Sequence, residues 1–375
     1  MSGRRPTVTA CILAHSSRGG LARLLGEIDG LVDEIVMGVD AASRDDTLEL
    51  ARSGADVVFR FEHVGPPVRA RLLPLRYATG DWILSLDEDE GLDDRFGSLL
   101  GELVEDARYS HYWFPRRWLV DLAPAAYLHA APWYPDWQLR LFRNQPARVW
   151  HTGRVHSGYR VMGPGCREDR TAILHYETVV LTPAEREAKV AFYRSHGGEG
   201  RAEEQHQSTI GWERRPLAPG PASGSTARRV RAARAISEVA AVPAAPTRPP
   251  WGAALEVAMP ETAGRRTMVL AEVTAHNTGR LDWLPAAAGA WPQLHLSHHL
   301  LSATGALVRR DGERIPIPRV VAPGDAARFL FTFRAPDEPG AHVLEWDLVS
   351  EGECWFAECG GRTARVPLQV VDRAR

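Results

Sequence analysis

An acidic run follows an apolar segment in the stretch LSLDEDE, residues 84–90. Its four acidic members are consecutive: Asp87, Glu88, Asp89 and Glu90. Packing gives no reason for such a run, because like charges repel and a buried carboxylate is costly. Two explanations are open at this point. The run is either an acidic turn at the surface or a set of carboxylates that holds a divalent cation.

The segments before this run predict alternating strands and helices. Strands are expected at 7–14, 33–40, 55–61 and 81–87, with helices at 19–32, 45–54 and 67–78. This alternation is typical of parallel βαβ units, in which ligands bind at the carboxyl ends of the strands. Asp40 and the acidic run both fall at such ends. Their placement favours a binding edge over a surface turn.

The rest of the chain predicts two further regions. Residues 109–175 combine aromatic side chains with short strand patterns, and a helix is expected over 182–196, with Thr182 and Glu185 at capping-box spacing. Strand patterns without helical periodicity recur from Trp251 onward. We therefore expect an α/β domain over 1–215, a Pro/Gly/Ala-rich linker with a possible helix at 228–242 over 216–250, and a β-sandwich over 251–375.

Length and composition restrict the class of protein. A chain of 375 residues favours two domains, and 44% hydrophobic and 25% charged residues are ordinary for a globular protein. The net charge of -2 argues against a dedicated nucleic-acid partner. No window approaches the roughly 20 apolar residues of a membrane span. The four cysteines complete no zinc site, and we expect a reduced, cytoplasmic protein.

Five stretches, in order, resemble family-2 glycosyltransferases over residues 7–195: VDEIVMGVDAASRDDTLELA, ATGDWILSLDEDE, YPDWQLRLFRN, GRVHSGY and LHY. The resemblance implies a GT-A nucleotide-sugar-binding domain with a Rossmann-like mixed sheet. It also implies inverting transfer of a sugar from a nucleotide-sugar donor, with UDP or TDP as the nucleotide, to a hydroxyl acceptor. That acceptor is a glycan, a lipid-linked molecule or a small molecule. VLAEVTAHNTGRLDW and HVLEWDLVSEGECWF resemble an immunoglobulin-like accessory domain of bacterial enzymes.

The resemblance implies a metal site at the acidic run. Transfer from a nucleotide sugar leaves a diphosphate, whose developing charge a hard cation held by carboxylates can stabilise. The family's Asp-x-Asp motif matches Asp87-Glu88-Asp89, with Asp89 the expected direct ligand of Mn²⁺ or Mg²⁺. His156 in GRVHSGY matches a histidine that completes the metal or pyrophosphate site, although a lone histidine is more often structural.

The resemblance also implies contacts to the donor. Asp40 matches an acid that faces the nucleoside, and its alternative role is a strand-end turn. Arg71 matches a basic position that pairs with the diphosphate, although its side chain could equally extend across the sheet. His15 follows the first strand, beneath the expected base. Asp87 and Glu88 complete the expected nucleotide-sugar contacts.

Inverting transfer needs a general base, and Asp136 in YPDWQLRLF is the candidate. Its alternative role is structural, orienting Arg140 through a salt bridge. The neighbouring Trp133, Tyr134 and Trp137 offer flat faces to a sugar ring, or belong to the core.

Departures from the family keep two rival functions open. Ser157 follows His156 where many relatives have glutamate, and the turns after the first two strands also differ from the common pattern. A catalytically degenerate sugar- or nucleotide-binding scaffold would fit these changes. A nucleotidyltransferase would share the carboxylates, but it would usually carry a Gly-rich phosphate loop near the first strand, and SSRGG at 16–20 is too weak a match.

Overall fold

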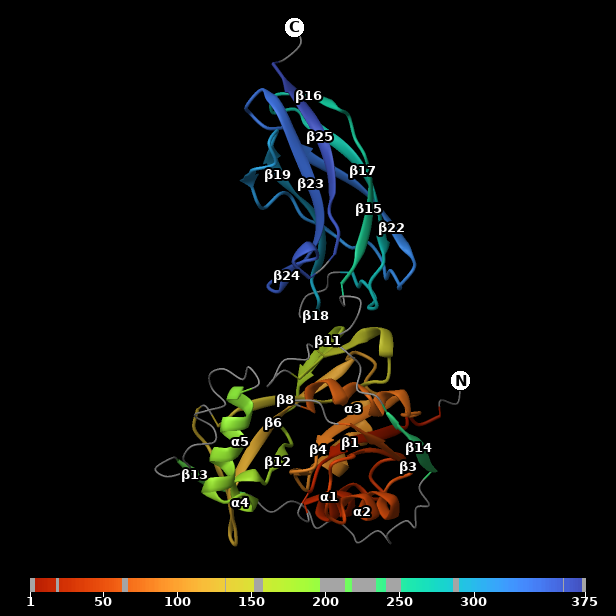
Figure 1. The fold of residues 1–375 in the computed structure, drawn as a ribbon, viewed down its shortest axis with the longest axis vertical. Coiled ribbons are helices and arrows are strands. Elements are labelled where there is room, and N and C mark those ends of the chain that lie inside the picture. The colour runs from red at the N-terminus through yellow and green to blue at the C-terminus, as the bar shows by residue number, and fades with distance from the viewer. Residues whose placement is uncertain are drawn as a thin grey trace. The chain divides into compact units, whose positions relative to one another are not determined.

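The structure is a computed structural model that describes residues 4–17, 20–62, 67–131, 133–151, 158–195, 213–217, 234–240, 251–285, 290–359 and 361–372. The chain divides into two compact units (Figure 1). The first contains Met1–Pro146, His151–Val161 and Gly165–Ala245; the second contains Ala147–Trp150, Met162–Pro164 and Pro246–Arg375.

Four parallel strands lie at the centre of the first unit. β1 (Val8–Ala14) lies between β2 (Glu34–Asp40) and β4 (Trp82–Asp87), and β3 (Val57–Phe61) pairs with the other edge of β2. The strands are buried along almost their whole length, as expected of parallel strands covered on both faces. The predicted α/β alternation is confirmed for this part of the chain, and it brings the carboxyl ends of β1, β2 and β4 to one edge.

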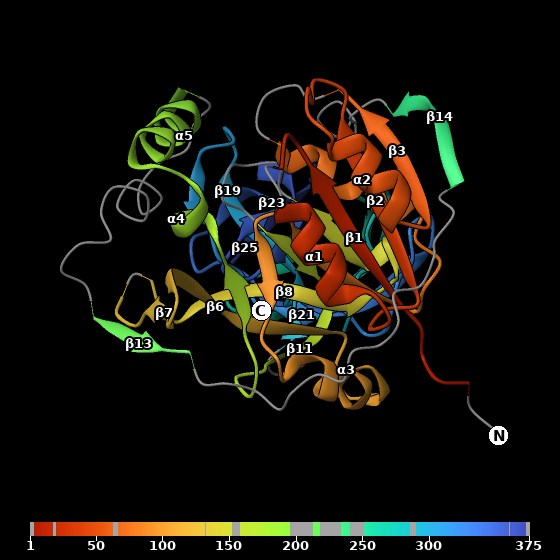
Figure 2. The ribbon, with the colours of Figure 1, turned by 90° about the horizontal axis from the view of Figure 1, so that it is seen from below.

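Helices α1 (Gly20–Ile28) and α2 (Thr47–Gly54) pack beside each other against these strands (Figure 2). The buried face of α1 consists of Leu21, Leu24, Leu25 and Ile28, and α3 (Phe96–Glu105) adds its own apolar face to the same core. The expected helix at 67–78 is instead two 3-10 segments, η1 (Pro67–Leu72) and η2 (Pro74–Arg76). Pro74 lacks the backbone N–H that a continuous α-helix would need there.

Antiparallel strands extend the sheet beyond β4. The order continues through β8 (Asp136–Arg143), β6 (His111–Leu122), β7 (Ala125–Leu128) and β13 (Arg214–Pro216). β12 (Ile173–His175) pairs with β6 and with β5 (Glu90–Leu92), so the end of β12 lies beside the acidic run. The shorter elements are η3 (Pro146–Arg148), β9 (Val149–His151), β10 (Tyr159–Val161) and β11 (Gly163–Arg167).

In the described residues, a short helix and a longer one come after β12. These are α4 (Glu177–Val180) and α5 (Pro183–Ser195). The predicted capping box of α5 is confirmed: the backbone N–H of Thr182 donates to the Glu185 carboxylate at 3.0 Å, and the backbone N–H of Glu185 donates to Thr182 Oγ1 at 3.3 Å. The start of α5 is therefore fixed by local hydrogen bonds.

The prediction of a possible helix at 228–242 is wrong for the part of this range that the structure describes. Residues Arg234–Ala240 form β14, which pairs in parallel with β3. An isolated helix of this length is marginal, whereas a strand at this place satisfies the open backbone groups along β3. The other residues of the expected helix lie outside the described residues.

Most of the described residues of the second unit form two sheets around one core. One sheet contains β15 (Ala253–Ala258), β17 (Met268–Asn277) and β22 (Ala326–Arg334). The other contains β16 (Thr262–Gly264), β25 (Ala364–Val371), β23 (Gly340–Ser350), β19 (Leu294–Ser302), β20 (Leu307–Arg309), β21 (Ile315–Pro316) and β24 (Cys354–Trp355). The remaining elements are β18 (Ala290–Trp291) and the 3-10 segment η4 (Ala357–Cys359). Alternate residues of β17 and β22 are buried, which matches the strand pattern of the sequence.

Cys354 and Cys359 form a disulfide bond, so the expectation of four reduced cysteines is wrong for this pair. The turn from β24 to η4 brings their Cα atoms to 6.7 Å, which the spacing in the sequence does not reveal. Cys11 and Cys166 are free thiols. In the described stretches, no helix combines the length and apolar character needed to cross a membrane.

Candidate active site

Three residues expected to contact the nucleotide sugar lie together. His15, Asp40 and Glu88 follow or end the neighbouring strands β1, β2 and β4. His15 Nδ1 lies 3.0 Å from Asp40 Oδ2, and the backbone N–H of His15 donates to the Glu88 carboxylate at 2.8 Å. Asp40 is buried, and its other oxygen accepts the backbone N–H of Ala42. Parallel pairing of the three strands is sufficient to bring these side chains together.

Arg71 and Arg140 hold Asp87 between them. Arg71 Nη1 lies 2.6 Å from Asp87 Oδ1, and Arg140 Nη2 lies 2.9 Å from Asp87 Oδ2. Burial alone would raise the pKa of Asp87, but the two guanidinium groups outweigh burial and keep this pKa well below its usual range. Both carboxylate oxygens of Asp87 are therefore engaged by arginines, and its role as a metal ligand stays a prediction.

Glu90, the last member of the acidic run, is fully buried. Its carboxylate accepts from Arg140 at 2.6 Å and from the backbone N–H of Asp87 at 3.1 Å, and Arg116 lies 3.5 Å away. A buried carboxylate without such partners would be strongly destabilising. Glu90 therefore fixes the turn and the two arginines, and it does not face the site as a free ligand.

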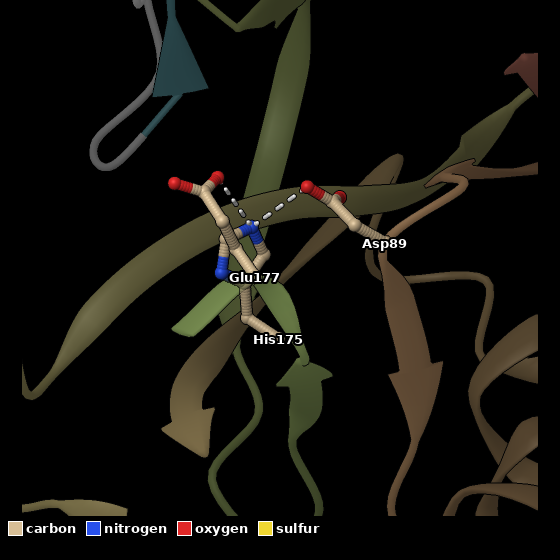
Figure 3. Close-up of side chains that lie close together, drawn as sticks. All are labelled: Asp89, His175 and Glu177. Carbon is tan, nitrogen blue, oxygen red and sulfur yellow. Dashed lines mark ion pairs between the residues drawn. The ribbon is translucent and has the colours of Figure 1, made fainter. Parts of the chain in front are cut away.

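Asp89, His175 and Glu177 form the group with metal-ligand geometry among the described residues (Figure 3). Their ligand atoms all lie within 4.8 Å of one another. His175 Nε2 lies 3.5 Å from Asp89 Oδ2 and 4.0 Å from Glu177 Oε2. His175 ends β12 and Glu177 begins α4, and the backbone N–H of Tyr176 between them donates to the carbonyl of Asp89 at 2.9 Å. This hydrogen bond ties the two segments together.

The donor set of this group fits a small divalent cation. Two carboxylates suit Mg²⁺ and Mn²⁺, and the imidazole of His175 moves the preference from Mg²⁺ toward Mn²⁺. Burial would raise the pKa of Asp89, but His175 and Lys189 outweigh burial and hold this pKa well below its usual range. Asp89 is thus a carboxylate at neutral pH. The ammonium of Lys189, on α5, lies 3.7 Å from Asp89 and 2.5 Å from Glu177.

His175 and Glu177 were not assigned to the site from the sequence. The stretch LHY contains His175, but the resemblance implies a metal role for His156, which lies outside the described residues. A signal was available: a histidine that ends a strand, followed two residues later by an acid that begins a helix. The placement of side chains at strand ends, which selected Asp40, would have selected His175 as well.

Asp136, the candidate base, begins β8 and is held by three donors. Its carboxylate accepts from Arg116 Nε at 2.8 Å, from the indole N–H of Trp118 at 3.0 Å, and from the Gln138 amide at 2.8 Å. The alternative role, a salt bridge with Arg140, takes a different partner: the register of β6 and β8 places Arg116 opposite Asp136, and Arg140 pairs with Asp87 and Glu90 instead. Burial would raise the pKa of Asp136, but these donors, Arg116 first, lower it.

Trp118 links the candidate base to the candidate metal group. Its indole N–H donates to Asp136, and its ring centroid lies 4.0 Å from that of His175. Trp133 is fully buried against Trp118, so the sugar-facing role considered for Trp133 is wrong and its core role is right. Tyr134 and Trp137 are half-buried, and for them a contact with sugar stays a prediction.

Comparisons with known proteins give only distant likenesses. No family model and no curated protein sequence matches the chain. Residues 1–349 of TarS from S. aureus match at 14% identity and a TM-score of 0.28, over 37% of this chain and 47% of that one. The same protein in complex with UDP-GlcNAc matches at 17% identity and a TM-score of 0.26, over 30% and 35%.

Two other solved structures match with similarly low TM-scores. The CARDB domain of PF1109 from Pyrococcus furiosus, in complex with di-metal ions, is 15% identical, with a TM-score of 0.23 over 32% of this chain and 89% of that chain. A β-glucosidase from Listeria innocua in complex with glucose is 13% identical, with a TM-score of 0.22 over 33% and 17%. None of these likenesses is strong enough to carry a function, so the chemistry of the site rests on its own residues.

Proposed function

We propose that the first unit is a GT-A glycosyltransferase that moves a sugar from a nucleotide-sugar donor, with UDP or TDP as the nucleotide, to a hydroxyl acceptor with inversion. The observation that carries the proposal is the Asp89–His175–Glu177 group beside the arginine-bound Asp87, at the carboxyl ends of parallel strands. A diphosphate needs cationic partners, and this edge offers both guanidinium groups and a donor set for a divalent cation.

The other residues at this edge of the sheet are assigned to parts of the nucleotide-sugar donor by their positions. His15 and Asp40 are proposed to contact the nucleoside, where a carboxylate can accept from a base N–H or a ribose hydroxyl. Arg71 and Glu88 are proposed to line the diphosphate and sugar. Mn²⁺ or Mg²⁺, held by Asp89, His175 and Glu177, would neutralise charge on the leaving diphosphate.

Asp136 is proposed as the base. Its carboxylate would accept the proton of the acceptor hydroxyl while that oxygen forms a bond to the anomeric carbon and the bond from this carbon to phosphate breaks. For this step the acceptor hydroxyl must replace one of the donors that now bind Asp136. The acceptor class stays open among glycans, lipid-linked molecules and small molecules.

A second candidate is a sugar- or nucleotide-binding scaffold without turnover. The engagement of Asp136 by three donors favours it, since a carboxylate so well satisfied is a weak base. Such a protein would bind the donor with the metal and leave it intact.

Thermal unfolding with UDP, TDP, GDP, ADP or CMP, each with and without Mn²⁺, tests the donor site. A ligand at 100 times its Kd should stabilise the protein by about 2.7 kcal/mol. We expect one nucleotide to act only with Mn²⁺, and Asp89→Ala to lose this effect while Glu187→Gln, an exposed acid of α5, keeps it.

The outcomes separate the two candidates. No stabilisation by any nucleotide would overturn the donor site itself. Stabilisation by one nucleotide, with no release of that nucleotide from its sugar conjugates when acceptors are supplied, would instead favour the scaffold.

A further inference from the structure

Lys189 is the only lysine among the 45 Lys and Arg residues of the chain. It lies on α5 and points its ammonium between two acids of the candidate metal group, 2.5 Å from Glu177 Oε2 and 3.7 Å from Asp89 Oδ2. The single ε-amine of the protein therefore occupies the space between two carboxylates that could hold a metal ion.

Two neighbouring acids of the site pair with arginines and not with a lysine. Asp87 and Asp136 bind the guanidinium groups of Arg71 and Arg116, respectively. A guanidinium is a broad, planar fork that holds carboxylates in fixed pairs, whereas an ammonium is a compact point charge on a flexible stem. Between acids spaced for a metal ion, only the ammonium resembles the ion in size and charge distribution.

The metal group combines fixed acceptors with a movable cation. His175 and Glu177 are buried, with 5% and 2% of their side chains exposed, and they are held by β12 and α4. The Lys189 side chain is 29% exposed and reaches the group from a separate helix. Rotation about the Lys189 side-chain bonds can move its ammonium to solvent without moving the backbone of either acid.

We propose that Lys189 is a displaceable resident cation of this site. Its ammonium neutralises Asp89 and Glu177 while no metal ion is bound, and a divalent ion that binds to these acids releases it. The proposal rests on the metal site of the proposed function and is independent of the reaction that the site catalyses. It implies that Lys189 weakens metal binding, because the ion must compete with a charge already in place.

Calorimetric titration of the full chain with Mn²⁺ alone tests this competition. We expect Lys189→Met, which keeps the apolar stem and removes the charge, to bind Mn²⁺ about tenfold more tightly than the unaltered chain. Arg52→Met removes a positive charge from an exposed position of α2 and should leave the affinity unchanged. Asp89→Ala should abolish binding, both alone and in combination with Lys189→Met.

Two failures are distinguishable in this titration. Equal or weaker binding by Lys189→Met would overturn the role of Lys189 and leave the metal site intact. Absence of binding in both the unaltered chain and Lys189→Met would overturn the metal site, and the resident-cation role with it.

Amine labelling gives a second readout that needs no substitution. Lys189 carries the only ε-amine, so acetylation of the folded chain, followed by mass spectrometry, reports on this one side chain, with the α-amine of the N-terminus as internal reference. We expect saturating Mg²⁺ to raise the acetylation rate of Lys189 several-fold relative to that reference. An unchanged or slower rate with Mg²⁺ bound would overturn the release of the ammonium.

Discussion

The four acids of the run 87–90 are not equivalent, although they are adjacent. Their partners differ: Arg71 and Arg140 for Asp87, the backbone N–H of His15 for Glu88, His175 for Asp89, and Arg140 again for Glu90. Burial, together with the charges of Asp89 and Asp87, raises the pKa of Glu88 to about 8 against the hydrogen bond from His15. The pKa values of Asp87 and Asp89 move in the opposite direction. Neither a plain surface turn nor a uniform set of metal ligands would show this division.

The substitution Asp136→Asn tests the proposed role of this single residue as the general base. We expect nearly unchanged donor binding and a loss of transfer of about 10²- to 10⁴-fold, because the amide cannot take a proton. Because the pKa of Asp136 is lowered, its base form persists at acidic pH, so transfer should show no acid limb from this group between pH 5 and 8. Release of the nucleoside diphosphate measures the rate. Asp121→Asn, an exposed acid near the β6–β7 turn, is the control, and near-normal transfer by Asp136→Asn would remove Asp136 as the base.

At the scale of elements, strand ends and strand registers assemble the site. The ends of β1, β2 and β4 bring together residues that the sequence marks as strand termini. The antiparallel register of β6 and β8 decides that Arg116 faces Asp136, and the pairing of β12 with β5 brings His175 to the acidic run. The strand ends follow from local sequence patterns, whereas the registers depend on pairing between strands that are distant in sequence.

Strand β19 carries a histidine whose burial should make the second unit sensitive to pH. His298 is fully buried beside Phe331, Phe333 and Trp346. Burial, with the positive charge of Arg309 next, lowers the pKa of His298 from 6.5 to about 3. An unfolded chain therefore binds this proton at higher pH than the folded chain, and the stabilising contribution present above pH 6.5 is lost as the pH falls toward 3.

His298→Gln should remove this part of the pH dependence. We expect the free energy of unfolding of the full chain to fall less steeply between pH 6.5 and 4 in the variant, measured by urea unfolding at several pH values. His276→Gln, whose histidine is 41% exposed on β17, should keep the original slope. Parallel curves for His298→Gln and the unaltered chain would contradict the assignment.

At the scale of the whole molecule, the two units have different chemistry. The titratable groups of the candidate site all lie in the first unit, and the disulfide lies in the second. Disulfides persist mainly in oxidising compartments, so this bond does not favour the cytoplasmic location expected from the sequence. The location itself stays an expectation.

Thiol counts and unfolding test the disulfide. Denatured, unreduced protein should show two reactive thiols, Cys11 and Cys166, and four after reduction. Replacing both Cys354 and Cys359 by serine should destabilise the second unit by about 2 kcal/mol, since the closed loop is short. Cys166→Ser is the control for thiol removal. Four thiols without reductant would contradict the bond.

The sequence alone determined the α/β alternation, the capping box of α5 and the position of Asp40 and the acidic run at strand ends, because these depend on local periodicity and on parallel strand ends. Tertiary structure decided the partner of Asp136, the joining of His175 and Glu177 to Asp89, the strand at Arg234–Ala240 and the disulfide. Each of these results from segments that pair or turn against one another. The pairing of distant segments is selected by the burial and hydrogen bonding of the complete fold, and no short window of residues contains that information; for the disulfide, the two cysteines are close in sequence but their spacing does not reveal the turn that joins them.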